Sequence, residues 1–309
     1  MFLFKTRSHD NHLCGVVTQA DGIAVACVDH KSSDAPVLEH CAFHPLAPGQ
    51  DQAQLLCKLV AEQRLDKIPC STLLAAEDYQ LLMVEAPEVP PAELRAAIRW
   101  RVRDLIDFHI DDAVLDVFDV PPTGARGMQE NLYVVVARAN VVKECAEAMQ
   151  AADAQLKVID IPELALRNIG ARLERDGSGD AMVYLGSRQG LITLSRDATL
   201  YLARSLDIGY DALHNNPHEQ VDRLALELQR SIDYYDRHFQ QAPVTRITLC
   251  PFPGLNAGFA EQLAQHTGIA VHELQLDELM SSRAGVDSEQ FSRCLLAIGA
   301  ALRTEPSRL

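Results

Sequence analysis

Apolar residues alternate with polar ones, or form short apolar runs, in three segments near the start of the chain. Turn residues separate these segments, which is the pattern of consecutive strands. The predicted strands cover residues 13–18, 22–29 and 37–43. A stripe with helical spacing follows at Leu55, Leu56, Leu59 and Val60, and it predicts a helix over residues 51–62. The chain therefore begins with a three-strand meander followed by a helix.

The same order recurs in the second half of the chain. Short apolar segments separated by turns predict strands over residues 181–185, 190–195 and 199–203. A long helix is predicted over 219–240, and a strand at 246–250 followed by a helix at 254–265 continues the pattern. The recurrence predicts an α/β protein built from two similar lobes.

A third unit is predicted between the two halves. Pro87 and Pro91 end a predicted strand at 79–85 and begin a helix at 92–108. Its remaining elements are two strands and a helix, at 114–120, 131–137 and 140–151. We predict an inserted β-α-β-β-α subdomain.

These patterns divide the chain into a first-lobe core, an insert and a second lobe. The polar, glycine-rich stretch at 175–180 is the predicted boundary between the lobes. The first-lobe core takes residues 1–74, 156–178 and 288–305, the insert takes 75–155, and the second lobe takes 179–287.

The chain of 309 residues carries a net charge of −15. This acidity disfavours nucleic acid and anionic lipid as partners, since both attract clustered lysine and arginine. No apolar run reaches the roughly 18 residues that cross a bilayer, and the apolar start is too short for a signal peptide. We therefore expect a cytoplasmic protein without a transmembrane segment. Its eight cysteines, with no Cys-x-x-Cys pair, are expected to be unpaired and mostly buried.

His40, Cys41 and His44 are metal-ligand residue types that lie close together in the sequence. On a strand, His40 and His44 share one face and Cys41 points to the other. No second cluster has ligand spacing, so no metal site is expected.

Four segments resemble one known family. They are residues 93–108 with the core Ala97-Ile98-Arg99-Trp100, residues 133–141, residues 226–235, and residues 297–303. Together they resemble the PilM family of type IV pilus assembly proteins. Within this family, the sequence most resembles MshI, the counterpart in the mannose-sensitive haemagglutinin (MSHA) pilus. The resemblance extends over about residues 13–303. It implies an actin-like (ribonuclease H-like) duplicated two-lobe fold with an inserted subdomain like the 1C subdomain of FtsA.

The family resemblance implies ATP between the lobes, cradled by glycine turns with an aspartate near the metal. Three loops depart from this pattern. Val17 and Tyr184 stand at positions where the family has an acid, although Gly186 keeps the glycine of the second turn. Cys250-Pro251 replaces a glycine-rich loop, and proline offers no N–H donor. We expect a pseudo-ATPase without catalytic residues, and the alternative is an ATP-binding switch or weak ATPase.

If ATP and Mg²⁺ bind, the resemblance implies contacts from Glu227, Arg230 and Ser231 on one helix, together with Gly186. The alternative is an ordinary helix surface with ion pairs between Arg223 and Glu227 and between Glu227 and Arg230.

Trp100 is the single tryptophan and lies among arginines, off the apolar stripe of its helix. An aromatic side chain among arginines is typical of an interface anchor, so Trp100, Arg101 and Leu105 are candidate partner contacts. The alternative is that Trp100 packs against a strand of its own subdomain. The resemblance implies a groove between the first-lobe core and the insert that binds the cytoplasmic tail of a PilN-type inner-membrane protein. The pilus motor ATPase complex is a further expected partner. We expect a scaffold held at the inner membrane through this partner.

Overall fold

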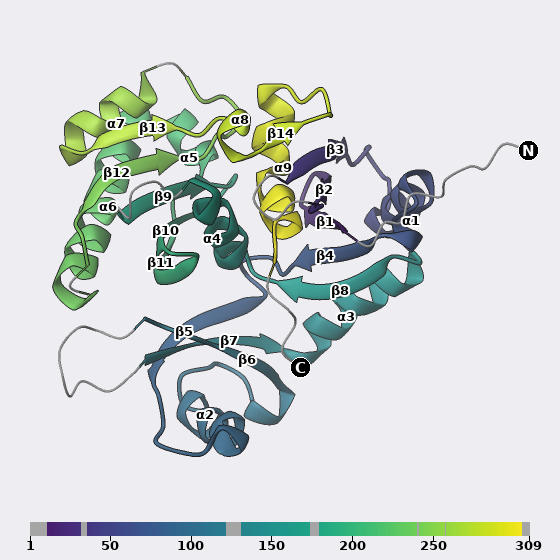
Figure 1. The fold of residues 1–309 in the computed structure, drawn as a ribbon, viewed down its shortest axis with the longest axis horizontal. Coiled ribbons are helices and arrows are strands. Elements are labelled where there is room, and N and C mark those ends of the chain that lie inside the picture. Colours follow the sequence, from purple (N-terminus) through teal and green to yellow (C-terminus); the bar gives the residue numbers. More distant parts are fainter. Residues whose placement is uncertain are drawn as a thin grey trace, which may run out of the picture.

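The computed structural model describes residues 11–31, 36–121, 131–173, 179–239, 241–256 and 258–304. Two large sheets face each other across a pair of helices, and a small three-stranded unit extends from one end (Figure 1). This arrangement has the two lobes and the insert that the sequence predicts.

The first sheet has the strand order β14-β3-β2-β1-β4-β8. Its strands are β1 (His12–Gln19), β2 (Gly22–Asp29), β3 (Val37–Pro45), β4 (Pro69–Leu73), β8 (Gln155–Asp160) and β14 (Ser281–Ser282). The first three strands form an antiparallel meander, and β4 and β8 extend the sheet in parallel. The predicted meander is confirmed.

The second sheet repeats this plan with the order β11-β10-β9-β12-β13. Its strands are β9 (Gly179–Leu185), β10 (Gly190–Arg196), β11 (Thr199–Leu206), β12 (Val244–Leu249) and β13 (Ala270–Glu273). Again a meander of three strands is followed by two parallel strands. The duplication predicted from the sequence pattern is therefore confirmed.

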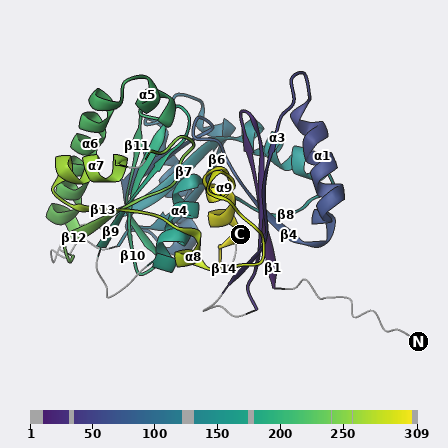
Figure 2. The same cartoon turned by 90° about the horizontal axis from the view of Figure 1, so that it is seen from above.

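Helices cover both faces of each sheet (Figure 2). They are α1 (Gln52–Gln63), α3 (Ala139–Ala151), α4 (Pro162–Leu173), α5 (Tyr210–Asn215), α6 (Pro217–Phe239), α7 (Phe259–Thr267), α8 (Leu276–Leu279) and α9 (Ser288–Ala301). Helices α1 and α3 lie on the outer face of the first sheet, and α6 and α7 lie on the outer face of the second. Between the sheets, α4 packs on β10 and β11, whereas α9 packs on β1 and β2. Helix α4, predicted in the first-lobe core, thus packs on the second sheet, whereas α9 from the end of the chain packs on the first sheet.

Glycines allow α9 to approach its neighbours closely. A Cβ atom on Gly15 of β1 would lie 2.0 Å from the carbonyl oxygen of Ala297. A Cβ atom on Gly299 would lie 2.5 Å from the carbonyl oxygen of Ala165 in α4. Both distances are too short for any side chain, so glycine at these positions lets the backbones touch.

The insert is a three-stranded antiparallel sheet covered by one helix. The sheet has the order β5-β7-β6 and consists of β5 (Tyr79–Glu85), β6 (Ala113–Asp119) and β7 (Asn131–Arg138). The helix α2 (Leu94–Val102) is shorter than the predicted helix over 92–108. After Val102 the chain continues in turns, and Ile106 and Phe108 still pack onto the core of the insert.

Two elements lie elsewhere than the predicted boundaries suggest. The side chain of Met149 on α3 packs with α1 and the first sheet, so this helix of the predicted insert also covers the first lobe. Strand β14, inside the predicted second lobe, pairs with β3. Both differences come from long-range packing that local sequence pattern does not encode. The linker at 175–178 and the loop at 122–127 lie outside the described residues.

Cys14 and Cys27 stand directly opposite each other on β1 and β2 and form a disulfide, with 4.1 Å between their Cα atoms. The expectation of unpaired cysteines is wrong for these two residues and holds for the other six. Within the described ranges, no helix has both the length and the apolar character needed to cross a bilayer.

Candidate functional site

Arg293 of α9 lies between the turns of the two sheets. Its guanidinium forms an ion pair with Asp21, in the turn between β1 and β2, and donates to the Tyr210 hydroxyl at 3.4 Å. It also lies over the Phe43 ring, 3.9 Å from the centroid, while its backbone carbonyl accepts from Gln19 Nε2 at 2.8 Å. The Arg293 side chain is only 12% exposed. One arginine therefore connects the two halves where their turns meet.

The turn between β9 and β10 is tied to the start of α5. The Tyr210 amide donates to the Gly186 carbonyl at 2.9 Å, and the Gly186 amide donates to the Gln189 carbonyl at 2.8 Å. The Tyr210 ring lies parallel to the Phe252 ring in the loop after β12, with 6.3 Å between centroids. The three loops for which the resemblance implies phosphate and adenosine contacts thus meet around Arg293 and Tyr210.

The residues that replace acids in these loops carry no negative charge at neutral pH. Val17 is buried in the core between the sheets. Burial raises the pKa of the Tyr184 hydroxyl, and Arg293 opposes this shift only in part. Burial likewise raises the pKa of the Cys250 thiol. The positions where the resemblance implies acids are therefore neutral, and the charges nearest Tyr210 are those of Arg293, Asp21 and Asp211.

The predicted cofactor residues of α6 form a network of their own. Glu227 accepts from Arg230 at 2.7 Å and from Arg204 of β11 at 3.1 Å. Burial raises the pKa of Glu227, but these two arginines lower it more, so it lies below its ordinary value. Ser231 donates to the Glu227 carbonyl at 2.7 Å, whereas Arg223 bonds to a glutamine of the same helix. Among the described residues, no hydrogen bond or ion pair joins this group to the turn at Gly186, and its role at a nucleotide stays a prediction.

The predicted partner residues lie on the surface of the insert. The Trp100 side chain is 69% exposed and Leu105 is 55% exposed. The Arg103 guanidinium lies 5.2 Å from the Trp100 ring centroid, and Arg101 forms an ion pair with Glu85 at 3.2 Å. The alternative that Trp100 packs against a strand of its own subdomain is wrong. Its contact with a partner stays a prediction.

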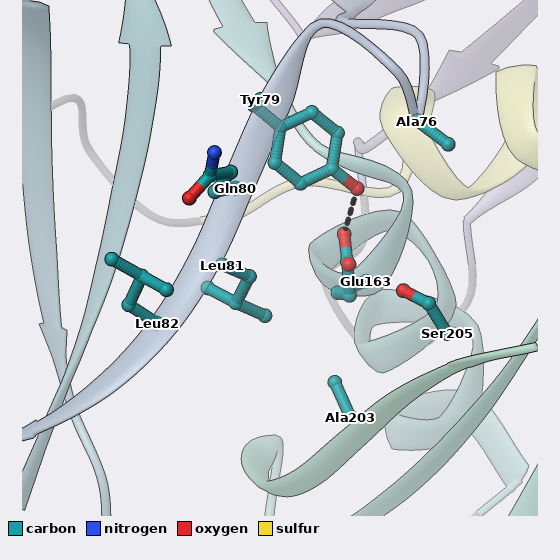
Figure 3. Close-up of a pocket in the computed structure, with 8 residues that line it drawn as sticks. All are labelled: Ala76, Tyr79, Gln80, Leu81, Leu82, Glu163, Ala203 and Ser205. Carbon is teal, nitrogen blue, oxygen red and sulfur yellow. Dashed lines mark hydrogen bonds between the residues drawn. The ribbon is translucent and has the colours of Figure 1, made fainter. Parts of the chain in front are cut away.

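A pocket of about 380 Å³ lies where the insert meets both lobes (Figure 3). Residues 79–82 of β5 and Ala76 line it on the side of the insert. Glu163, at the start of α4, forms its base, and Ala203 and Ser205 of β11 form the opposite wall. Three separate parts of the chain thus build this pocket.

The backbone edge of β5 borders the pocket. Side chains of a strand alternate between its two faces, yet four consecutive residues, 79–82, line the pocket. Strand β5 is also the outer strand of its sheet, and the described residues include no strand paired with its other side. An exposed edge of this kind has unpaired N–H and C=O groups that an added strand can bond.

Glu163 is 3% exposed, and its Oε2 accepts from the Tyr79 hydroxyl at 2.5 Å. Burial raises the pKa of Glu163; the bonds from Tyr79 and from its own amide lower it, and nearby Asp160 raises it. Arg303 pairs with Asp160, whereas the described residues include no ion pair to Glu163. Sequence reasoning missed Glu163 and Tyr79, although an acid beside Pro162 in an apolar segment was a visible signal.

His12, Asp29 and Glu39 also lie together, with their possible ligand atoms within 4.8 Å of one another. The Lys31 ammonium lies 3.5 Å from Asp29, and Arg283 donates to Glu39 at 2.5 Å. Because cations already neutralise both carboxylates, this cluster is an ion-pair network across β1, β2 and β3.

A duplicated pair of five-strand cores, with the loops of both halves meeting between them, defines the actin-like fold. In this chain, an insert follows β4, and a pocket lies between the insert and the two lobes. No protein-family model matches the sequence, and no curated protein matches it.

Solved structures show the same fold over almost the whole chain. A PilM–PilN type IV pilus biogenesis complex aligns with a TM-score of 0.75 at 23% identity, covering 95% of this chain and 99% of that one. The cytoplasmic domain of EpsL, an inner-membrane component of the Vibrio cholerae type II secretion system, aligns with a TM-score of 0.54 at 14% identity, covering 95% and 96%. A Bacteroides thetaiotaomicron protein of actin-like ATPase fold and unknown function aligns at 0.51 and 10% identity, covering 91% and 96%. The predicted actin-like fold and its likeness to PilM are confirmed.

Proposed function

We propose that this protein is a cytoplasmic scaffold of a type IV pilus assembly platform of the MSHA type. It binds the N-terminal cytoplasmic tail of a PilN-type inner-membrane protein and thereby lies at the membrane. The full-length likeness to a PilM–PilN complex supports this function, since both chains are covered almost completely.

The pocket below the insert is the proposed place for the tail. It lies between the insert and the core, and it is bordered by the free edge of β5. An extended peptide added to such an edge gains main-chain hydrogen bonds, while pockets take its side chains. The carboxylate of Glu163 and the net charge of −15 favour the basic residues that usually flank a membrane span.

Binding of a labelled tail peptide, followed by fluorescence polarisation, tests the function. We expect saturable binding to the full chain. The variant Ala76→Trp fills the exposed rim of the pocket and should weaken binding at least tenfold. Glu77→Trp places the same side chain on the next exposed residue, which does not line the pocket, and should leave binding unchanged. Absence of binding at high micromolar peptide would contradict the function.

We also propose that the interlobe junction has no ATPase activity, because buried Val17 and Tyr184 stand where the resemblance implies acids and Arg293 pairs with the nearby Asp21. A titration with ATP and Mg²⁺, read as a thermal shift, tests this. A shift that grows with ATP concentration and is lost in Glu227→Ala would instead support the ATP-binding switch.

A further inference from the structure

The base of the pocket combines a buried carboxylate with open space. Glu163 is 3% exposed and lines a pocket of about 380 Å³. Burying an ionised carboxylate is costly unless a cation or several donors compensate it. Here the Tyr79 hydroxyl and the amide of Glu163 itself are its hydrogen-bonding neighbours.

The arginines near Glu163 interact with a different carboxylate, that of Asp160. Asp160 ends β8 and forms an ion pair with Arg303, and Arg167 of α4 also acts on it. Asp160 and Tyr79 both face Glu163, and neither carries a positive charge. Glu163 therefore lacks a positive counterpart among the described residues while lying next to space that a side chain can enter.

The walls of the pocket suit a long side chain with a charged end. Leu81 and Ala203 are apolar and can cover a methylene stem, as lysine and arginine stems require. The Ser205 hydroxyl points from its wall towards Glu163 and offers a second acceptor (Figure 3). An ammonium or guanidinium group needs several acceptors in this arrangement.

We propose that Glu163 and Ser205 form a subsite for one lysine or arginine side chain of the bound tail. This inference rests on the proposed function, because the tail delivers the cation. It goes further by naming the chemistry that the pocket recognises. The cation would supply the counter-charge that no described residue gives Glu163, and it would fix the register of the tail along β5.

A double-mutant cycle between protein and peptide tests the subsite. Each lysine of the labelled tail peptide is replaced singly by norleucine and each arginine by citrulline. At one position, the replacement should weaken binding to the unmodified protein by about tenfold to a hundredfold, the range for a hydrogen-bonded charged group. In Glu163→Gln, the parent peptide should bind as weakly as that replaced peptide, and the replacement should then change binding less than twofold.

Two further variants separate this effect from a change in folding or in overall charge. Glu85→Gln removes a carboxylate at the far end of β5, away from the pocket, and should keep the full preference for the cation. Ser205→Lys adds an ammonium at an exposed residue beside Glu163. It should weaken binding of the parent peptide but not binding of the replaced peptide. Thr199→Lys adds the same charge at the other end of β11 and should change the binding of neither peptide.

The outcomes distinguish this inference from the proposed function. One outcome is that the parent peptide binds, but every replacement weakens binding to Glu163→Gln and to the unmodified protein by the same factor. The subsite proposal is then wrong and the scaffold function stands. If the parent peptide does not bind, the scaffold function fails. The subsite is then tested with N-acetyl-arginine methylamide against its citrulline analogue by NMR. Equal shifts of the pocket resonances with both compounds would overturn it, and a larger response to the arginine compound would support it.

Discussion

The guanidinium of Arg293 forms an ion pair with Asp21 across the junction of the two lobes. The two residues belong to opposite ends of the chain, since α9 is the last helix and Asp21 lies in the first turn. Arg293 also lies over Phe43 of β3 and bonds to Tyr210 of the second lobe. This single side chain therefore connects the β1–β2 turn, β3 and α5.

We predict that Arg293→Ala lowers the free energy of unfolding by about 2 kcal/mol. The variant removes a cation–π contact that is largely shielded from water, together with the packing of the arginine stem. Urea unfolding followed by circular dichroism measures the change. Arg237→Ala is the control, because Arg237 is 76% exposed and pairs only at 3.9 Å, and it should change stability by less than about 0.5 kcal/mol. Equal effects of both variants would contradict the role of Arg293.

Gly15→Ala should be among the most destabilising single substitutions in the chain. Its Cβ atom would lie 2.0 Å from the Ala297 carbonyl oxygen, so α9 must move away from β1. We expect a loss of about 3 kcal/mol or more, because overpacking against backbone is not relieved by a rotamer change. Thermal unfolding gives the comparison with Gly285→Ala, which meets no atom within 4 Å and should be close to neutral.

Glu163→Gln should make the unliganded protein more stable at neutral pH. Burial raises the pKa of Glu163 in the folded state above its ordinary value of 4.5. The folded state then holds a proton that the unfolded state has lost, so stability falls as the pH rises from 4.5 towards the raised pKa. Glutamine does not ionise, and the gain over the unmodified protein should grow across this window and vanish below it.

Urea unfolding of both proteins at a series of pH values checks this sign. The same variant is expected to weaken binding of the tail peptide, so stability and binding should change in opposite directions. A Glu163→Gln protein that is less stable at neutral pH would contradict this prediction.

Trp100 should contribute little to stability, because its side chain is 69% exposed. We predict a change below about 0.5 kcal/mol for Trp100→Ala. Ile98→Ala on the buried face of the same helix should cost about 2–5 kcal/mol. Iodide should quench the fluorescence of this single tryptophan strongly in the free protein. Weak quenching before any partner is added would place Trp100 in a packed position instead.

Local pattern predicted most elements because strand alternation and helical stripes report which side of an element is buried. The meanders at β1–β3 and β9–β11 are examples, and their repetition disclosed the duplication. The end of α2 was missed because Ile106 and Phe108 continue the apolar pattern while packing back onto the insert. The disulfide was missed since Cys14 and Cys27 become neighbours only through the register of β1 and β2.

The features of the candidate sites also divide into those that the sequence determined and those that only tertiary structure decided. The sequence by itself determined the two-lobe plan, the insert, the neutral residues Val17 and Tyr184 in the loops and the acidity of the chain, since each depends on residue type or near neighbours. Tertiary structure decided which groups meet. It brought Arg293 to Asp21 and Tyr79 to Glu163, pairs separated by long stretches of chain. Such pairs depend on how helices cross sheets, and that packing has no signature in local periodicity.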